Sequence, residues 1–336
     1  MKISAVIPAY NSAAFIAEAI NSILKQSTPV YEIIVVDDGS SDDTFAVVQG
    51  LTGPIRYHKQ VNRGPAAARN QGIKMAKGEW IAFLDADDQW TSDKIERQLA
   101  TLTRYPELHL LAGDMSEIDL NNTVLTPSVL AKHGLLSSYI DAQGRPIVNA
   151  LSKLLHKNFI PTGTVLVKRD TLLAVGLFNE AIHFGEDLEL WAKIAAYYPI
   201  SCMPEILMLR RLHHHNATHA TVSMLIDNIK VMQALRLSIG LPLQQQGLKP
   251  ERLVADAYAA VAYWHFNLQE YPLARRASLD SLRVALTRRA LFYGLLACLP
   301  ASCLLLLKQV KAYVDSLFYS VIIKAQHCKF LIYGFK

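Results

Sequence analysis

The sequence has few cysteines and no glycine-rich phosphate-binding loop. Only four cysteines occur among 336 residues, Cys202, Cys298, Cys303 and Cys328, and no two of them form a CxxC pair. This spacing argues against a disulfide framework and against a structural zinc site, and it fits a reducing cytosol. Neither GxGxxG nor GxxxxGKS/T is present. A nucleotide bound by this chain must therefore have its phosphate charge met by side chains or a metal ion.

Charged residues and chain-breaking residues are also scarce. Charged residues make up 19% of the chain and hydrophobic residues 51%, with 14 prolines and 16 glycines. This balance excludes disorder, collagen and low-complexity scaffolds, and the length predicts two domains of about 150 residues each. The first apolar run, residues 3–7, meets Pro8 and is too short for a signal-peptide core. We therefore expect a cytoplasmic location.

The basic charge is concentrated in the second part of the chain. Residues 1–225 carry 20 Lys and Arg against 23 Asp and Glu, whereas residues 226–336 carry 14 against 6. Because this basic part is apolar and lacks basic clusters interleaved with aromatics, it favours an anionic membrane surface over nucleic acid. The uncharged run 290–307 is 18 residues long but contains Pro300. We therefore do not predict that it forms a membrane-spanning helix. We expect residues 289–336 to lie on the inner face of the cell membrane, with a buried helical hairpin as the alternative.

The order of apolar patterns predicts an α/β domain followed by helices. Short apolar runs at 3–7, 33–36, 80–84 and, more weakly, 55–58 predict buried strands, and helical patterns follow at 15–24, 66–76 and 95–102. This alternation predicts a mostly parallel sheet flanked by helices, with its ligand crevice beyond the carboxyl ends of the strands. From residue 223 the pattern is helical, at 223–239, 250–268, 272–287 and 289–325. We expect an α/β domain over residues 1–222 and an all-α region over 223–336.

Three polar clusters stand where the expected strands end, at 8–11, 37–40 and 85–88. We expect all three to open onto one crevice. Asp85 and Asp87 follow the apolar run WIAFL, where a carboxylate is costly unless it has a partner. Two acids separated by one residue can present oxygens to a hard cation that holds a diphosphate. This pair therefore predicts a metal–diphosphate site.

Four motifs in order carry a resemblance to a known family: AVIPAYN, EIIVVDDGSSDDT, GPAAARNQGIKMAKGEWIAFLDADD and GLFNEAIHFGEDLELWAKIA. With these motifs, residues 1–215 resemble family 2 of the inverting glycosyltransferases, which have the GT-A fold. The resemblance implies a nucleotide-diphospho-sugar donor, a divalent metal (Mg or Mn), and hexosyl transfer to an acceptor hydroxyl with inversion at the anomeric carbon. It also implies a glycan or lipid-linked acceptor in cell-surface polysaccharide assembly.

On the donor side, the resemblance implies that Asp38 hydrogen-bonds the nucleotide base. It places Pro8, Tyr10 and Asn11 in the wall of that pocket. Arg69, in the ARN segment, would contact the donor, and an ion pair with a neighbouring carboxylate is the alternative.

At the metal and the base, the resemblance implies that Asp87 is the principal metal ligand and that Asp85 lies near the sugar and ribose. Asp187, in the ED motif, would be the general base. The segment Arg210–Asn216 resembles the family's YRxH segment, although Leu209 stands where the family usually has an aromatic residue. Arg211 would contact the diphosphate, and His213 would reach the metal.

Other classes of protein remain open. A catalytically inactive GT-A-like protein that binds nucleotide-sugars would share these motifs. A nucleotidyltransferase would need a basic glycine-rich loop where this chain has PAYNS, and a phosphotransfer protein would need Thr or Ser and Lys at later strand ends. The residues do not name the sugar, the nucleotide or the acceptor, because the stretch 110–158 carries no strong motif.

Overall fold

The structure is a computed structural model that describes residues 1–213, 222–300 and 303. The chain divides into two compact units, residues 1–254 and 255–336. Helix α10 (Val222–Gln245) packs against α9 (Glu186–Tyr197) and so belongs to the first unit. The expected limit of the catalytic domain at residues 222 and 223 stays a prediction.

One mixed sheet forms the centre of the first unit, with the strand order β3-β2-β1-β4-β8-β6-β9-β5 and β7 paired to β6. Its N-terminal half is parallel, because β1 pairs with β2 and β4, and β2 with β3; β6 and β9 are also parallel, and the other pairs are antiparallel. The expected α/β class is confirmed. The strands are β1 (Ile3–Ala9), β2 (Glu32–Asp37), β3 (Ile55–Lys59), β4 (Trp80–Phe83), β5 (Gln89–Trp90), β6 (Leu110–Ile118), β7 (Val124–Thr126), β8 (Leu166–Lys168) and β9 (Ile200–Arg211).

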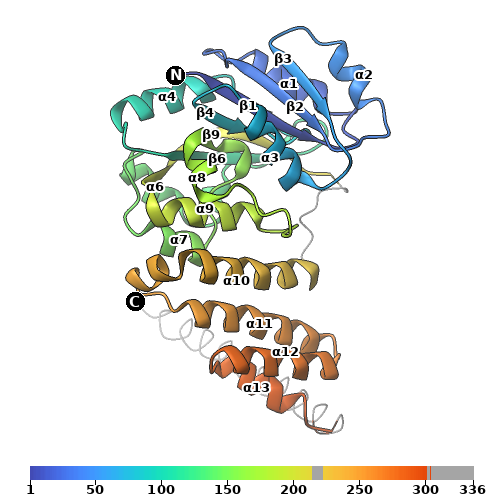
Figure 1. Cartoon of the computed structure of the whole chain (residues 1–336), viewed down its shortest axis with the longest axis vertical. Helices are drawn as coiled ribbons and strands as arrows, with labels where there is room; N and C mark the ends of the chain where they lie inside the picture. The colour runs from blue at the N-terminus through green and yellow to red at the C-terminus, as the bar shows by residue number, and fades with distance from the viewer. Residues whose placement is uncertain (214–221, 301–302, 304–336) are drawn as a thin grey trace, which may run out of the picture. The chain divides into compact units, whose positions relative to one another are not determined.

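Helices cover both faces of the parallel half, which explains why β1, β2 and β4 are buried throughout. Ile3 and Ile7 lie in the same apolar core as Ile20 of α1 (Ile16–Leu24). On the other face, α3 (Pro65–Met75) packs on β1 and β2 (Figure 1). A Cβ on Gly72 would lie 2.3 Å from Cγ1 of Val6, so only glycine allows this close approach. Helices α2 (Thr44–Gln49) and α4 (Lys94–Arg104) complete this half.

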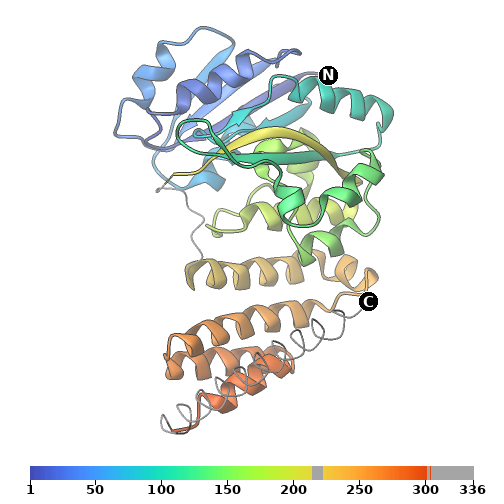
Figure 2. The ribbon, with the colours of Figure 1, turned by 180° about the vertical axis from the view of Figure 1, so that it is seen from behind.

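The other half of the sheet is dominated by the long strands β6 and β9, which run side by side in Figure 2. A short 3-10 turn, η1 (Thr162–Thr164), lies beside them. Buried side chains fix it, because the Trp90 indole donates to the Gly163 carbonyl at 2.8 Å and the Gln98 amide donates to the Thr164 carbonyl at 2.9 Å. The helices here are α5 (Val129–Lys132), α6 (Leu136–Ala142), α7 (Ala150–His156), α8 (Arg169–Val175) and α9.

The described part of the second unit is helical. Helix α11 (Pro250–Asn267) enters it, and α12 (Tyr271–Val284) packs against α13 (Arg288–Leu296). Small side chains such as Ala274 and Ala290 are fully buried, which lets the helices approach closely. Within residues 1–213, 222–300 and 303, no helix combines the length and hydropathy that a membrane crossing requires. The expected helix over 289–325 is confirmed as far as Leu296, where α13 ends, and residues 304–325 lie outside the described residues.

Candidate active site

The loops after β1 and β2 are joined by hydrogen bonds. The Asn11 backbone N–H donates to Ser40 Oγ at 2.8 Å, and Asn11 Oδ1 accepts from the Ser41 N–H at 2.9 Å. Asn11 adopts a left-handed backbone (φ 47°) to make both contacts. Pro8 is buried in β1, whereas Tyr10 is exposed. The structure thus brings the first two polar clusters together and leaves the Tyr10 ring open to a ligand.

Asp38 is almost fully buried and holds the segment that leads into α3. One carboxylate oxygen accepts from the Arg63 N–H at 2.9 Å and from Gln60 Nε2 at 2.8 Å, and the other accepts from the Gly64 N–H at 2.7 Å. Asp38 therefore fixes the N-terminus of α3. Whether it also contacts a nucleotide base stays a prediction.

The neighbouring Asp37 is a structural residue of the same loop. Its carboxylate accepts from the Ser40 N–H at 2.7 Å and from the Tyr57 hydroxyl. Burial opposes ionisation, but these hydrogen bonds hold the pKa of Asp37 below its usual value. Asp37 is thus ionised, and both of its carboxylate oxygens accept hydrogen bonds from the protein.

Asp87 and His213 meet at the end of β4, although 126 residues separate them. Asp87 Oδ2 lies 2.9 Å from His213 Nε2, and the imidazole stacks on the Phe15 ring with centroids 5.3 Å apart. The pair predicted from the sequence to meet a metal is therefore adjacent. His214 and His215 lie outside the described residues.

Arg211 is buried behind this pair. Its guanidinium contacts the Glu18 carboxylate at 2.7 Å and the Asp87 carbonyl at 3.3 Å, and its backbone N–H donates to Asp88 at 2.9 Å. Arg211 thus ties β9 to the acidic cluster and to α1. Its contact with a diphosphate stays a prediction.

The residues around Asp87 fit a divalent cation. Asp87 Oδ2 and His213 Nε2 bring an oxygen and a nitrogen within 2.9 Å of each other, and Asp85 adds a second carboxylate on the same loop. Burial, and then the charges of Asp87 and Asp85, raise the pKa of Asp88 well above its usual value, which reflects negative charge that a cation would neutralise. No group of three metal-binding side chains occurs within the part of the chain that the structure describes. Such a sparse set is typical of Mg²⁺ sites that also use substrate phosphates and water.

Asp187 lies in the first turn of α9. The helix begins after Gly185, whose left-handed backbone (φ 85°) favours glycine. One Asp187 oxygen accepts from the Leu188 N–H at 2.6 Å, and the other lies 3.4 Å from the Thr162 hydroxyl in η1. Burial raises the pKa of Asp187, and it raises the pKa of the adjacent Glu186 to about 7. These carboxylates are thus poised to exchange protons closer to neutral pH than ordinary acids.

Arg69 connects the two sides of the site. One guanidinium nitrogen contacts Asp85 at 2.8 Å and another contacts Glu186 at 2.9 Å. The side chain is buried, and its Nε lacks a hydrogen-bond partner. The structure therefore shows the ion-pair alternative for Arg69, with partners on both the metal side and the Asp187 side.

Sequence reasoning missed several residues of this site. Glu18 and Phe15, which contact Arg211 and His213, carry no signal because they sit in an ordinary amphipathic helix. Asp88 carried a signal as the fourth residue of DADD. Glu186, beside Asp187 in the same motif, is the partner of Arg69.

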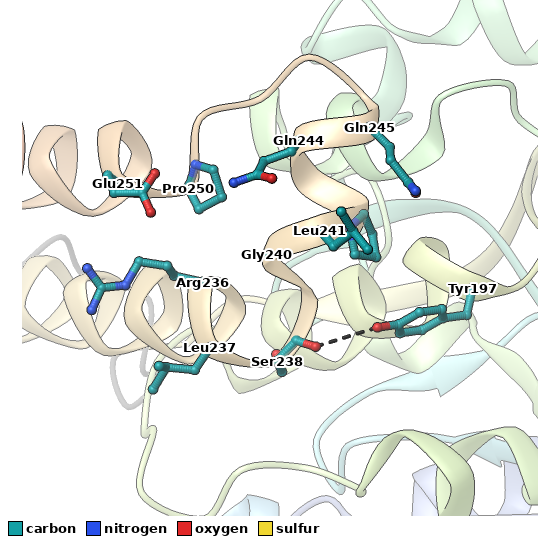
Figure 3. Close-up of a pocket in the computed structure, with 11 residues that line it drawn as sticks. Tyr197, Arg236, Leu237, Ser238, Gly240, Leu241, Gln244, Gln245, Pro250 and Glu251 are labelled. Carbon is teal, nitrogen blue, oxygen red and sulfur yellow. Dashed lines mark hydrogen bonds between the residues drawn. The ribbon is translucent and has the colours of Figure 1, made fainter.

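A separate cavity of about 620 Å³ lies at the far end of α9 (Figure 3). Tyr197 lines it, and its hydroxyl points toward the Ser238 carbonyl at 3.5 Å. Arg236, Gln244 and Glu251 contribute polar groups. None of the residues singled out from the motifs lines this cavity, so the candidate active site is defined by the clustered carboxylates.

These features define a class: an α/β fold with an acidic loop after β4 and a second pair of carboxylates at the start of α9. The profile of "Glycosyl transferase family 2" matches residues 4–127. The "putative teichuronic acid biosynthesis glycosyltransferase TuaG" of Bacillus subtilis is 30% identical over 212 residues, which cover 60% of this chain and 77% of TuaG. An "uncharacterized glycosyltransferase" of Rickettsia felis is 36% identical over 199 residues, which cover 58% of this chain but only 30% of that protein. The chain belongs to glycosyltransferase family 2, as its motifs predicted.

Solved structures agree with the fold. S. aureus TarS, residues 1–349, in complex with UDP-GlcNAc has a TM-score of 0.64 at 19% identity, covering 86% of this chain and 83% of that one. The same TarS fragment with UDP has a TM-score of 0.60 at 20% identity, covering 84% and 81%. At this identity the likeness concerns the fold, and it confirms the GT-A-like architecture.

Proposed function

We propose that this protein transfers a sugar from a nucleotide-diphospho-sugar to an acceptor hydroxyl with inversion at the anomeric carbon. One observation carries the proposal: Arg69 bridges Asp85 of the acidic loop and Glu186, the neighbour of Asp187. A carboxylate suited to be a base therefore faces the same crevice as the carboxylates suited to a metal and diphosphate. An inverting single displacement requires this opposition of base and leaving group.

The residues divide the chemistry between them. Asp87 and His213 would hold a divalent cation, which when bound supplies positive charge to the leaving diphosphate. Asp187 accepts the proton of the acceptor hydroxyl as the new C–O bond forms. Thr162, 3.4 Å from Asp187, orients that carboxylate toward the acceptor. No separate general acid is needed, because a neutralised diphosphate leaves readily.

The donor and acceptor are proposed from the neighbours' names. TarS is described with UDP and UDP-GlcNAc, so uridine diphosphate sugars are the first donors to test. TuaG is named for teichuronic acid biosynthesis, which supports a glycan or lipid-linked acceptor of the cell surface. The alternative is an inactive protein that binds a nucleotide-sugar without transferring it.

The test separates binding from transfer. Nucleotide-sugars that bind should raise the thermal unfolding temperature in the presence of Mn²⁺. With the donor identified, the product's anomeric configuration is read by NMR, and inversion is expected. Asp187→Asn should bind donor normally and lose about a hundredfold to ten-thousandfold in transfer rate. Retention of configuration, or an unchanged rate in Asp187→Asn, would overturn the mechanism, and binding without any turnover would favour the inactive alternative.

We also propose that the C-terminal region docks on an anionic membrane surface. In the described part, Leu291, Phe292 and Leu295 of α13 are exposed, while Ala290 on the opposite side of the helix is buried. Arginines stand at positions 288 and 289, where this helix begins. Exposed apolar residues beside basic ones are typical of helices that lie in a membrane interface. This location would bring the enzyme to a lipid-linked acceptor.

A further inference from the structure

The residue after Arg69 makes an unusual set of contacts. Asn70 is buried, and its side-chain amide bonds both backbone groups of Phe178, 108 positions away. Asn70 Nδ2 donates to the Phe178 carbonyl at 2.9 Å, and Asn70 Oδ1 accepts from the Phe178 N–H at 3.0 Å. Nδ2 also lies 3.1 Å from Glu180 Oε1. The amide therefore fixes the start of the segment 178–186 that leads into α9.

Arg69 holds the other end of the same segment. It contacts Glu186 at 2.9 Å, and its guanidinium lies over the Phe178 ring, 5.5 Å from the centroid. Between these two points, the Asp227 carboxylate on α10 accepts from the N–H groups of His183 and Phe184, at 3.0 and 3.1 Å. The whole segment before Asp187 is thus held by side chains from α3 and α10.

Helix α3 is itself fixed to the donor side of the sheet. Gly72 packs directly on Val6 of β1, and Asp38 anchors the backbone at Gly64, where the helix begins. A side chain on α3 that grips the segment 178–186 therefore sets the distance between the acidic loop and Asp187.

We propose that Arg69 and Asn70 are positioning residues that hold Asp187 in line with the bound donor. This inference rests on the proposed role of Asp187 as the base. A misplacement of about 1 Å can cost on the order of a hundredfold in rate without weakening ligand binding. Loss of either side chain should therefore lower kcat and leave donor affinity nearly unchanged.

The charge of Arg69 predicts a second measurable effect, on the pH dependence of kcat/KM. The groups that face Asp187 are Arg69 from α3, Asp85 after β4, the adjacent Glu186 on α9 and the neutral Thr162 hydroxyl in η1. Among them Arg69 carries the positive charge that favours the ionised carboxylate. Its removal should raise the pKa of the base, so the acidic limb of the kcat/KM profile should move to higher pH. A purely structural role would not move this limb.

The experiment uses the full chain with Mn²⁺ and the donor identified above. Asn70→Leu keeps the branched shape of the side chain but removes the hydrogen bonds, and we expect kcat to fall about a hundredfold while the donor dissociation constant, measured by calorimetry, stays within about twofold. Asn267→Leu, at an exposed asparagine of α11, is the matched control and should leave kcat unchanged.

Arg69→Met should lower kcat and shift the acidic limb of the kcat/KM profile to higher pH, whereas Arg69→Lys should keep the limb near its original pH. Arg97→Met removes an exposed arginine of α4 that pairs with Asp93 and should change neither.

The outcomes are distinguishable. A folded Asn70→Leu with normal kcat would overturn the positioning role, and so would a loss of donor affinity as large as the loss of kcat, because that result marks a donor contact. If Asn70→Leu does not fold, the comparison of Arg69→Met with Arg69→Lys decides: equal acidic limbs overturn the proposal. If Asp187→Asn is itself fully active, the proposed function has failed and not this inference alone.

Discussion

The two sides of the active site are held in different ways. On the proposed donor side, most of the hydrogen bonds that hold the loops involve backbone groups. Asn11 and Asp38 bond N–H groups and hydroxyls of neighbouring loops. On the base side, Asp187 depends on buried side chains that come from distant elements, Arg69 and Asn70 from α3 and Asp227 from α10. Loops held by backbone hydrogen bonds suit a ligand that is contacted at several points. A general base instead requires a single carboxylate held at one position.

The electrostatics of the two sides differ in the same sense. Asp85 and Asp87 are partly exposed and lie beside Arg69 and His213. Burial instead raises the pKa of Asp187 and Glu186. Exposure favours a carboxylate that binds a metal, and burial favours one that takes up a proton.

Asp87→Asn should have the largest effect, because it removes charge from the metal site while keeping the side-chain shape. Metal stabilisation of a leaving group is worth several kcal/mol, so activity should fall about a thousandfold or more. Titration calorimetry with Mn²⁺ and nucleoside diphosphate should show weaker metal-dependent binding. Unchanged binding in this variant would remove Asp87 from the metal site.

The pH dependence should report the buried base side. Below the pKa of the base, kcat/KM should fall tenfold per pH unit, and the midpoint should lie above 3.8, the ordinary value for aspartate. The sign follows from burial, which stabilises the protonated form, so activity is lost as the pH falls through this raised pKa. Since Glu186 titrates near 7 beside Asp187, the apparent values belong to the pair. A limb centred at or below 3.8 would contradict a buried base.

The sequence predicted the parallel half of the fold well. The four expected strands match β1 to β4 within two residues at each end. Because β1, β2 and β4 are buried on both faces, they must be apolar runs of this length. The half-buried β3 gave the weaker signal. The carboxyl ends of parallel strands then place Asn11, Asp38 and Asp87 at one edge. The resemblance to the family added His213, which the structure brings to 2.9 Å from Asp87.

The long-range contacts around Asp187 and Arg211 could not be predicted. Arg69 and Glu186 are 117 residues apart, and Arg211 and Glu18 are 193 apart. Nothing in local periodicity encodes such pairs, because they depend on how the second half of the sheet packs. Asn70 was part of a recognised motif, yet its partners are backbone groups of Phe178, and backbone groups carry no sequence signal.

Asp38→Asn should separate base recognition from phosphate binding. Asparagine keeps the size of the side chain and one oxygen acceptor, which limits the loss of the hydrogen bonds to Gln60, Arg63 and Gly64. If Asp38 also contacts the base, affinity for a nucleoside diphosphate should fall about tenfold or more, since a hydrogen bond to a charged group is worth about 1.5–3 kcal/mol. Affinity for pyrophosphate with Mn²⁺ should not change. Equal losses for both ligands would restrict Asp38 to anchoring α3.

The smallest effect on catalysis is expected from α13, which the proposed function assigns to membrane docking. A triple change of Leu291, Phe292 and Leu295 to serine should reduce binding to vesicles containing anionic lipid, because it removes the exposed apolar side chains of this helix. Turnover with a soluble acceptor should be unaffected, since the motifs of the active site all lie in the first unit.

A matched control comes from α10 in the first unit, where Leu237 and Leu241 are also exposed. Changing these two leucines to serine removes exposed apolar surface from the first unit and leaves α13 unaltered, so vesicle binding should persist. Cosedimentation with neutral and anionic vesicles at low and high salt measures both variants. Binding should weaken with salt, because the attraction between arginines or lysines and anionic lipid is screened. If the unaltered chain does not bind anionic vesicles at low salt, the membrane proposal is wrong, while the assignment to glycosyltransferase family 2 stands.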